Sequence, residues 1–419
     1  MSKKILSTLV AVSFVIVGCE STRSKKAELP TPKNGWSAKM QALSTTLSDL
    51  LPLVTSKKKF ADPKNDARIE ADVKAVRALA HSLKTGEQPS SDPSMQIMTG
   101  LFEADIARAL DALKTGNRDY ARHVLKDTTS YCIQCHTATS NGPDFPRLNL
   151  DIDTKDLTPV DRAEFYAATR QFDAALSSYI SALDDQTFAS EDPFEWEAAA
   201  RGALAIAVRV KQNPADTMKV IAAAKSNSKL AKSSKTALTS WENSVKEWAK
   251  ETQASAETPP QMLQESETLI RRAQKRQEFP LDHSQDILYF RAGSRLHELL
   301  QQPPATKGHS KELRARALYW AGVASEATRD MNFWTMHETM YEQCIRLRPG
   351  TEQARQCFAR LKESVTLGYT GSAGVNIPAE VSARLESFRV IAEGPKAQAP
   401  TPETAKPSDK PAEATPEKK

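Results

Sequence analysis

The chain of 419 residues has only 5 cysteines, and aromatic residues make up 6% of it. It lacks convincing stretches in which apolar and polar residues alternate, which argues against β-strands. The net charge of +5 is small for this length and the basic residues are spread out, which argues against a nucleic-acid-binding surface. No phosphate-binding loop and no nucleophile with a nearby base stands out in the sequence. We therefore expect no independent enzymatic activity.

One apolar stretch lies near the N-terminus, and no other is long enough to cross a membrane. Two lysines precede an apolar run over residues 5–17, and Gly-Cys follows, ending at Cys19. This pattern resembles the signal of bacterial lipoproteins, in which the cysteine becomes the first residue and carries lipid. The resemblance implies a signal peptide over residues 1–18 and a lipid anchor on Cys19; the alternative is an ordinary secretory signal. Because Glu20 follows, we expect an outer-membrane lipoprotein of the bacterial cell envelope that faces the periplasm.

The rest of the chain divides into helical parts and polar tails. Residues 19–35 are polar and form a predicted tether, and residues 394–419 hold six prolines and no large apolar residue, so they are predicted to be disordered. Between these tails apolar residues recur every three or four positions, which predicts an all-α fold with a linker over 251–262. Over 36–145 the pattern predicts four helices with short connections, typical of an antiparallel four-helix bundle. These helices are expected to begin near Trp36, Asp66, Pro93 and Arg118, with the third ending near Lys114 and the last running beyond His136.

Beyond Thr158 the spacing of small and aromatic residues changes. The positions concerned are Ala163, Tyr166, Phe172, Ala175, Tyr179 and Ala182. This spacing resembles the tetratricopeptide repeat, a helix-turn-helix unit that stacks on its neighbours. The resemblance implies a superhelix of such units over 158–250 and 263–393. The alternative is a series of alanine-rich helix hairpins without that repeat.

Two of the five cysteines occur in "YCIQCHTATS", as Cys132 and Cys135 directly before His136. A dithiol redox motif usually begins a helix after a strand, and no strand is predicted here. A zinc site would need further ligands, which the sequence does not place nearby. A disulfide across two residues of a helix would be strained. The remaining interpretation is covalent attachment of one haem c, with a thioether bond to each cysteine and His136 as the proximal iron ligand. This attachment occurs outside the bacterial cytoplasm, where the signal peptide directs the chain.

A four-helix domain with C-x-x-C-H late in the fourth helix resembles the class II cytochromes c, which include cytochrome c prime. The resemblance covers about a quarter of the chain. It implies that any sixth iron ligand comes from early in the first helix, where this chain has Met40. His81, Met95 and Met98 would lie at the same end of such a bundle and remain alternatives. His123 would lie about 20 Å from His136 along the helix, which excludes it.

The last two cysteines lie on either side of the Pro349-Gly350 turn. Cys344 and Cys357 are equally far from this turn on helices expected to run back against each other, so we expect them to form a disulfide. The alternative is two buried free thiols. The basic run "LIRRAQKRQEF" is interpreted as a solvated helix face, and the histidines at 283, 297, 309 and 337 show no ligand spacing.

These features predict a membrane-anchored periplasmic monohaem cytochrome. Its function would be electron transfer to or from a partner protein, which the helical repeats would dock. One alternative is a haem protein that binds or senses a small ligand such as nitric oxide or carbon monoxide. Another is a repeat scaffold in which the haem is structural. The sequence does not identify the partner or the sixth ligand.

Overall fold

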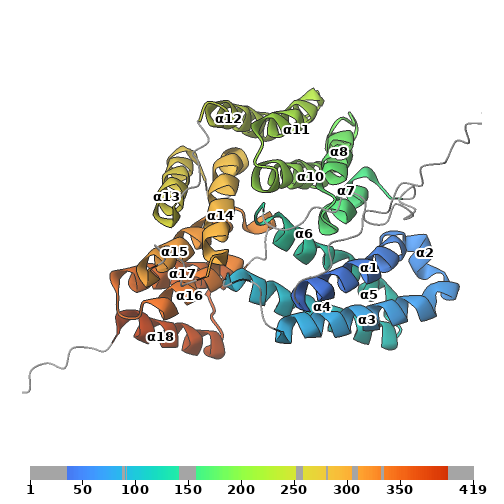
Figure 1. Ribbon diagram of the computed structural model, residues 1–419, viewed down its shortest axis with the longest axis horizontal. Helices are drawn as coiled ribbons and strands as arrows, with labels where there is room; N and C mark the ends of the chain where they lie inside the picture. The colour runs from blue at the N-terminus through green and yellow to red at the C-terminus, as the bar shows by residue number, and fades with distance from the viewer. Residues whose placement is uncertain are drawn as a thin grey trace, which may run out of the picture.

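The computed structural model describes residues 35–394 except 87–89, 91, 141–156, 252–257, 280–281, 304–309 and 332–334. The predicted signal peptide, Cys19, nearly all of the tether and the C-terminal tail lie outside the described residues. Within them the chain is almost entirely α-helical, which confirms the all-α prediction (Figure 1). The described exception is one antiparallel pair of two-residue strands, β1 (Thr370–Gly371) and β2 (Gly374–Val375).

The described residues of the N-terminal part form six α-helices and one short 3-10 helix (Pro63–Asn65). The α-helices are α1 (Gly35–Thr55), α2 (Lys57–Ala61), α3 (Asp66–Thr85), α4 (Pro93–Lys114), α5 (Arg118–Asp127) and α6 (Thr129–Thr137). The local sequence explains where several helices begin, because side chains just before them accept hydrogen bonds from backbone N–H groups of the first turn. Asp92 accepts from Ser94 N before α4, and Asn117 accepts from Tyr120 N before α5. Gly116, with φ at 78°, adopts the left-handed conformation that ends α4.

The predicted fourth helix is divided in two, which corrects the expectation of one helix running beyond His136. Three hydroxyl groups at the division bond to carbonyl oxygens three residues back: Thr128 to Leu125, Thr129 to Lys126 and Ser130 to Asp127. Such bonds compete with the backbone bonds of a continuous helix. As a result α6 begins anew after Thr128, and it packs mainly against the next helix in the chain, α7 (Pro159–Ala168).

The remaining helices mostly pack against their neighbours in sequence (Figure 1). They are α8 (Phe172–Leu183), α9 (Phe188–Glu191), α10 (Pro193–Ala205), a π-helical turn (Ile206–Val210), α11 (Pro214–Ser226), α12 (Lys232–Trp248), α13 (Pro259–Arg276), α14 (Asp286–Gln301), α15 (Lys311–Ala327), α16 (Met336–Leu347), α17 (Glu352–Gly368) and α18 (Ala379–Glu393). Helices α7, α10 and α11 each begin with proline after a residue whose side chain caps the helix. Helix α13 starts at Pro259, inside the predicted linker.

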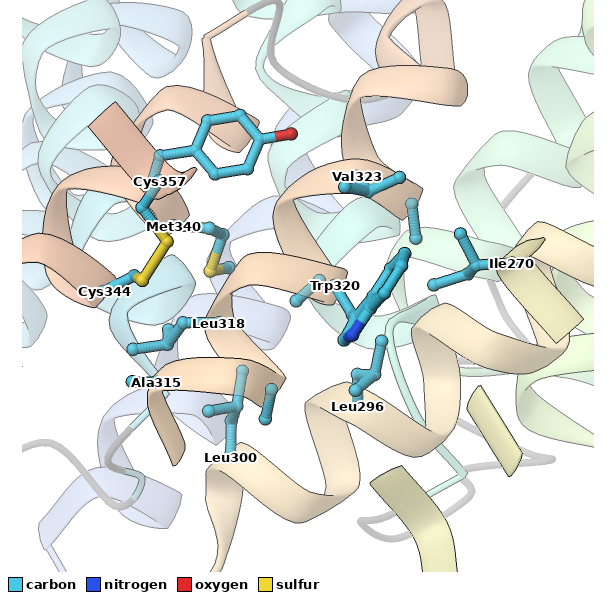
Figure 2. Packing of buried hydrophobic residues seen from close by; sticks show 14 of the residues in the cluster. Ile270, Leu296, Leu300, Ala315, Leu318, Trp320, Val323, Met340, Cys344 and Cys357 are labelled. Carbon is cyan, nitrogen blue, oxygen red and sulfur yellow. A yellow bond between two sulfur atoms is a disulfide. The ribbon is translucent and has the colours of Figure 1, made fainter. Parts of the chain in front are cut away.

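Three hydrophobic cores hold these helices together. The first core lies among α1, α3, α4 and α5 and includes Leu50, Val54, Ile69, Val73 and Ile106. The second core lies among α7 to α12 and includes Ala163, Phe172, Leu183, Leu204 and Trp241. The third core lies among α13 to α18 and includes Ile270, Leu296, Trp320, Tyr341 and Phe388. Figure 2 shows part of the third core, where Trp320 of α15 lies beside Ile270 of α13 and Leu296 of α14.

Three of the described helices connect the cores. Phe165 of α7, a helix of the second core, is buried in the first. Met98 of α4, a helix of the first core, is buried in the third core. Ile287 and Phe290 of α14, a helix of the third core, are buried in the second. The described parts of the chain therefore pack against one another rather than standing apart, and α6 lies where they meet.

Candidate functional site

The motif helix α6 lies between all three cores. Cys132 packs against the first core, Ile133 against the second and Cys135 against the third. Neighbouring residues on a helix project about 100° apart, so three nearby side chains can reach three different surroundings. Each of the six residues from Tyr131 to His136 is half-buried. The motif is therefore shielded on several sides rather than presented on a loop.

The two motif thiols are kept protonated by their surroundings. Burial, together with the neighbouring Cys135, raises the pKa of Cys132 to about 12. Burial and the nearby Asp92 carboxylate raise the pKa of Cys135 to about 11, against a smaller opposite effect of Arg170. Thiol–disulfide exchange needs the thiolate. The surroundings of these cysteines therefore disfavour the dithiol redox interpretation.

His136 is held in one protonation state and one orientation. Its Nδ1 lies 2.8 Å from the carbonyl oxygen of Ala168 on α7. A carbonyl can only accept, so Nδ1 carries the hydrogen and Nε2 keeps its lone pair. Burial and the Arg170 guanidinium lower the pKa of His136 to about 3. The ring is thus a neutral imidazole, oriented by a backbone carbonyl, which is the usual arrangement of a metal-binding histidine.

Arg170 is a residue of this site that sequence reasoning missed. It joins α7 to α8 with φ at 58°, a left-handed conformation unusual for arginine. Its Nη1 donates to the backbone oxygen of His136 at 3.3 Å, and its guanidinium lies 5.1 Å from the centre of the Phe172 ring. It caps the C-terminal end of α6, where a positive charge is favourable. An arginine at a turn carries no sequence signal for this role.

Tyr131 attaches the other end of α6 to α4. Its hydroxyl donates to Asp105 Oδ2 at 2.5 Å, and its ring meets that of Phe102 edge-on at 6.2 Å. Asp105 also pairs with Arg108. Burial raises the pKa of Tyr131, so the hydroxyl remains a donor at neutral pH. The aromatic residue directly before the first motif cysteine could have suggested such a contact, although its partner could not be deduced.

The structure separates the candidate sixth ligands into two groups. Met40 of α1 is half-buried and packs against the first core, as Cys132 does. Met98 is buried in the third core, against which Cys135 packs, and Met95 is half-buried on the same helix. His81 is exposed and lies 3.4 Å from Glu103. His123, which its distance along the helix already excludes, is also exposed and pairs with Asp127 at 3.2 Å. Met40 and Met98 therefore share cores with the motif cysteines, whereas the two histidines face solvent.

The donor set of α6 fits a covalently attached haem. Cys132 and Cys135 would supply two protonated thiols, and His136 would supply a neutral nitrogen donor with its lone pair available. The motif residues are half-buried among side chains of all three cores, so these side chains must move apart to admit a haem. Attachment would therefore couple the haem to the packing of all three cores.

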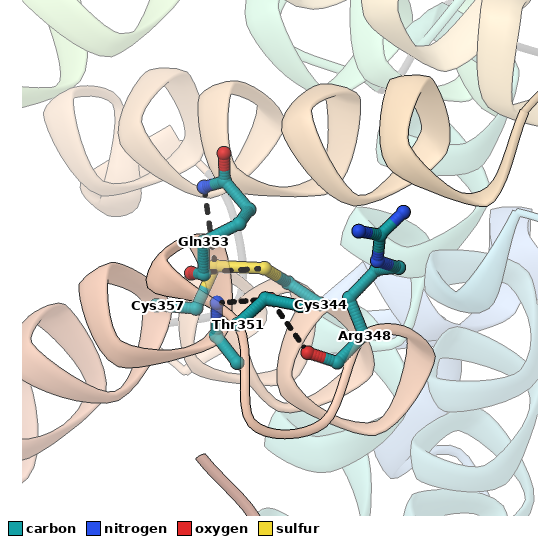
Figure 3. Close-up of a disulfide and its surroundings, with 6 residues drawn as sticks. Cys344, Arg348, Thr351, Gln353 and Cys357 are labelled. Atoms are coloured by element: carbon teal, nitrogen blue, oxygen red, sulfur yellow. Dashed lines mark hydrogen bonds between the residues drawn. A yellow bond between two sulfur atoms is a disulfide. The ribbon is translucent and has the colours of Figure 1, made fainter. Parts of the chain in front are cut away.

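A separate covalent link joins α16 to α17. The disulfide connects Cys344 and Cys357, whose Cα atoms are 6.3 Å apart (Figure 3). Gly350, with φ at 71°, forms the turn between the helices, and the Thr351 hydroxyl donates to the Arg348 oxygen at 2.7 Å. The structure thus brings together the pair that the sequence predicts. Both cysteines are fully buried in the third core.

The other features singled out in the sequence have structural partners. In the basic run, Arg271 pairs with Glu267 and Arg276 pairs with Glu247, as expected for a solvated helix face. His337 lies 2.6 Å from the Ser364 hydroxyl and His297 lies 2.6 Å from Asp92, while His309 lies outside the described residues.

Among the described residues, no helix combines the length and apolar character needed to cross a bilayer. Comparisons of the chain with models of protein families, with curated proteins and with solved structures found no match.

Proposed function

We propose that the chain is a monohaem c-type cytochrome that transfers electrons to or from a partner protein. The observation that carries this proposal is His136, a neutral imidazole whose Nδ1–H is held by Ala168 within a C-x-x-C-H helix. Cys132 and Cys135 would hold the haem, and His136 Nε2 would bind its iron. When bound, the haem supplies a one-electron redox couple.

The surrounding residues would keep this centre rigid. Tyr131 and Arg170 attach the two ends of α6 to α4 and to the α7–α8 turn. Packing against three cores would restrict movement of α6 and partly shield the motif from water. A site that moves little between redox states suits rapid electron transfer, and a low dielectric and few waters influence the redox potential.

Contacts between the helices support the proposed architecture. Helices α1, α3, α4 and α5 each contact two of the others, which supports a cytochrome c prime-like four-helix haem domain completed by α6. The helix hairpins from α7 to α18 support a tetratricopeptide-like array that would dock the partner. We further propose that lipid on Cys19 anchors the protein to the outer membrane, facing the periplasm.

A second candidate function is a scaffold in which the haem is structural. The observation that favours it is the contact of α6 with all three cores, because a group attached there would join them. In that case removal of the haem would loosen the whole chain, and the haem would exchange electrons poorly with added redox proteins.

The first experiment tests haem attachment. The protein is expressed with the cytochrome c maturation machinery, and a denaturing gel is stained for peroxidase activity. Stain should remain on the wild-type chain and disappear from Cys132→Ser/Cys135→Ser. The matched control Cys344→Ala/Cys357→Ala, which also removes two cysteines, should keep the stain. Absence of stain on the wild-type chain would refute the proposal.

Two further measurements address function and location. Redox titration and electron exchange with small redox proteins should show a reversible one-electron couple in the wild-type protein. Ready binding of carbon monoxide by the reduced protein would instead favour the ligand-binding function. Cys19→Ser should abolish lipid labelling, and normal labelling in that variant would contradict the anchor.

A further inference from the structure

The small cavity beside α6 is lined by sulfur and nitrogen donors from three distant parts of the chain. Met98 comes from α4, His297 from α14 and Met336 from α16. Met98 is 6% exposed and Met336 is 4% exposed, so both thioethers are withdrawn from water. Buried methionine usually only fills space. His297 lines the same cavity, and the filling of space does not explain a histidine there.

His297 is oriented by a buried carboxylate. Its Nδ1 lies 2.6 Å from Oδ2 of Asp92, which is 3% exposed, while Oδ1 of Asp92 accepts from Ser94 N at 3.0 Å. The Asp92 side chain thus accepts hydrogen bonds as a carboxylate. Nδ1 therefore donates to Asp92. Within the described part of the chain His297 Nε2 has no hydrogen-bond partner, and it is available to a ligand in the cavity.

This carboxylate–histidine arrangement is common behind protein metal sites. No three side chains of His, Cys, Asp or Glu among the described residues form a group that could hold a metal. The cavity differs from such groups because two of its donors are methionine thioethers. Thioethers bind soft ions such as Cu(I), and imidazole also suits copper. We propose that Met98, Met336 and His297 form a binding site for a soft monovalent metal ion, with Cu(I) as the expected occupant.

The charges around the cavity favour a monovalent ion over a divalent one. Asp92 contributes one negative charge behind His297, and the half-buried Arg209 guanidinium, which also lines the cavity, contributes one positive charge. Arg209 lies 4.3 Å from the centre of the Phe290 ring. Arg314 also acts on Asp92, and Asp286 and Arg201 act on Arg209, so these groups together carry no excess of negative charge. Each further positive charge in a poorly solvated site is therefore costly. Zn²⁺ and Cu²⁺ would bring twice the charge and prefer harder donors.

The site is separate from the proposed haem site. Gln134 of α6 lines the cavity, and one of its buried side-chain atoms, Oε1, has no hydrogen-bond partner among the described residues. Gln134 and His136 are two residues apart, about 200° around the helix axis, so His136 projects from the opposite side of α6. The metal site goes beyond the proposed function, and it requires that the iron takes any sixth ligand from a residue other than Met98.

The test measures retention of Cu(I) against a competing chelator, bicinchoninate. Cu(I) is added without oxygen as its acetonitrile complex, with no thiol reductant, so that the disulfide stays closed. The haem-loaded chain and Cys132→Ser/Cys135→Ser are used in parallel, because free thiols would also bind Cu(I). We expect both to retain one equivalent, which makes the result independent of haem attachment.

Substitutions test which side chains bind the copper ion. Met98→Leu/Met336→Leu should lose the bound copper, whereas Met340→Leu, a buried methionine of the same core outside the cavity (Figure 2), should keep it. Asp92→Asn, which retains a helix-capping side chain, should weaken binding about 10–100-fold. Circular dichroism confirms that each variant is folded. The proposal is overturned if the wild-type chain retains no Cu(I), if Met98→Leu/Met336→Leu retains as much as Met340→Leu, or if Zn²⁺ binds these residues in preference.

Discussion

Breaking the Cys344–Cys357 disulfide should destabilise the third core. The size of the effect depends mainly on the length of the loop that the bond closes. The bond joins cysteines 13 positions apart, so it closes a loop of 14 residues. In the chain-entropy description, opening such a loop in the unfolded state costs about 3 kcal/mol of stability. That corresponds to about a hundredfold in the folding equilibrium. Helices α16 and α17 should show the largest effect because the bond joins them directly.

The comparison must separate the bond from the side chains. Both cysteines are 0% exposed, so replacing them with alanine also removes buried atoms. The wild-type chain and Cys344→Ala/Cys357→Ala are therefore each unfolded and refolded with and without dithiothreitol. Reductant should cost the wild-type chain about 3 kcal/mol and leave the variant unchanged.

Three cores need not unfold in one step, so a single urea transition is not sufficient. Amide hydrogen exchange measured by mass spectrometry should report faster opening in α16 and α17 of the reduced wild-type chain, with little change in α3 or α4. If the wild-type chain is equally stable with and without reductant, the bond does not constrain the unfolded chain and the reasoning is wrong. An equal loss in the alanine variant would show that reductant acts elsewhere.

Three further predictions concern the haem ligand, the half-buried Glu164 and the buried His337. Met40→Ala should make the haem high-spin and allow the reduced protein to bind carbon monoxide, whereas the control Met95→Leu should leave the spectrum unchanged; a low-spin Met40→Ala would place the sixth ligand elsewhere. Burial raises the pKa of Glu164 to about 7 from 4.5, so stability should fall as pH rises through this interval, and Glu164→Gln should gain about 1–3 kcal/mol near pH 8 in urea unfolding. An unchanged pH profile in that variant would contradict the assignment. Burial, aided by Arg329 and Arg360, lowers the pKa of His337 to about 4 from 6.5, so stability should be lost as pH falls between these values. His337→Gln should flatten that loss, and a slope as steep as in the wild-type chain would show that other groups cause it.

Several elements of the fold follow from short segments of sequence. Helix α4 spans Pro93–Lys114, as predicted, with Asp92 as its cap, Pro93 as its first residue and Gly116 just after it. The disulfide follows from two cysteines placed symmetrically about a turn. The division of the fourth helix at Thr128 was not predicted, because three hydroxyl-to-carbonyl bonds act together there and each is individually weak.

The sequence by itself determined the helical class, the positions of most helices in the N-terminal part, and the motif with Cys132, Cys135 and His136. Helix caps, apolar periodicity and motif spacing act over a few residues and can be read locally. Only the tertiary structure decided that α6 lies between three cores, that Ala168 orients His136, and that Asp92 meets His297 across 205 positions of the chain. These contacts depend on how separate helices pack, and packing is determined by the combined shape of side chains remote in sequence.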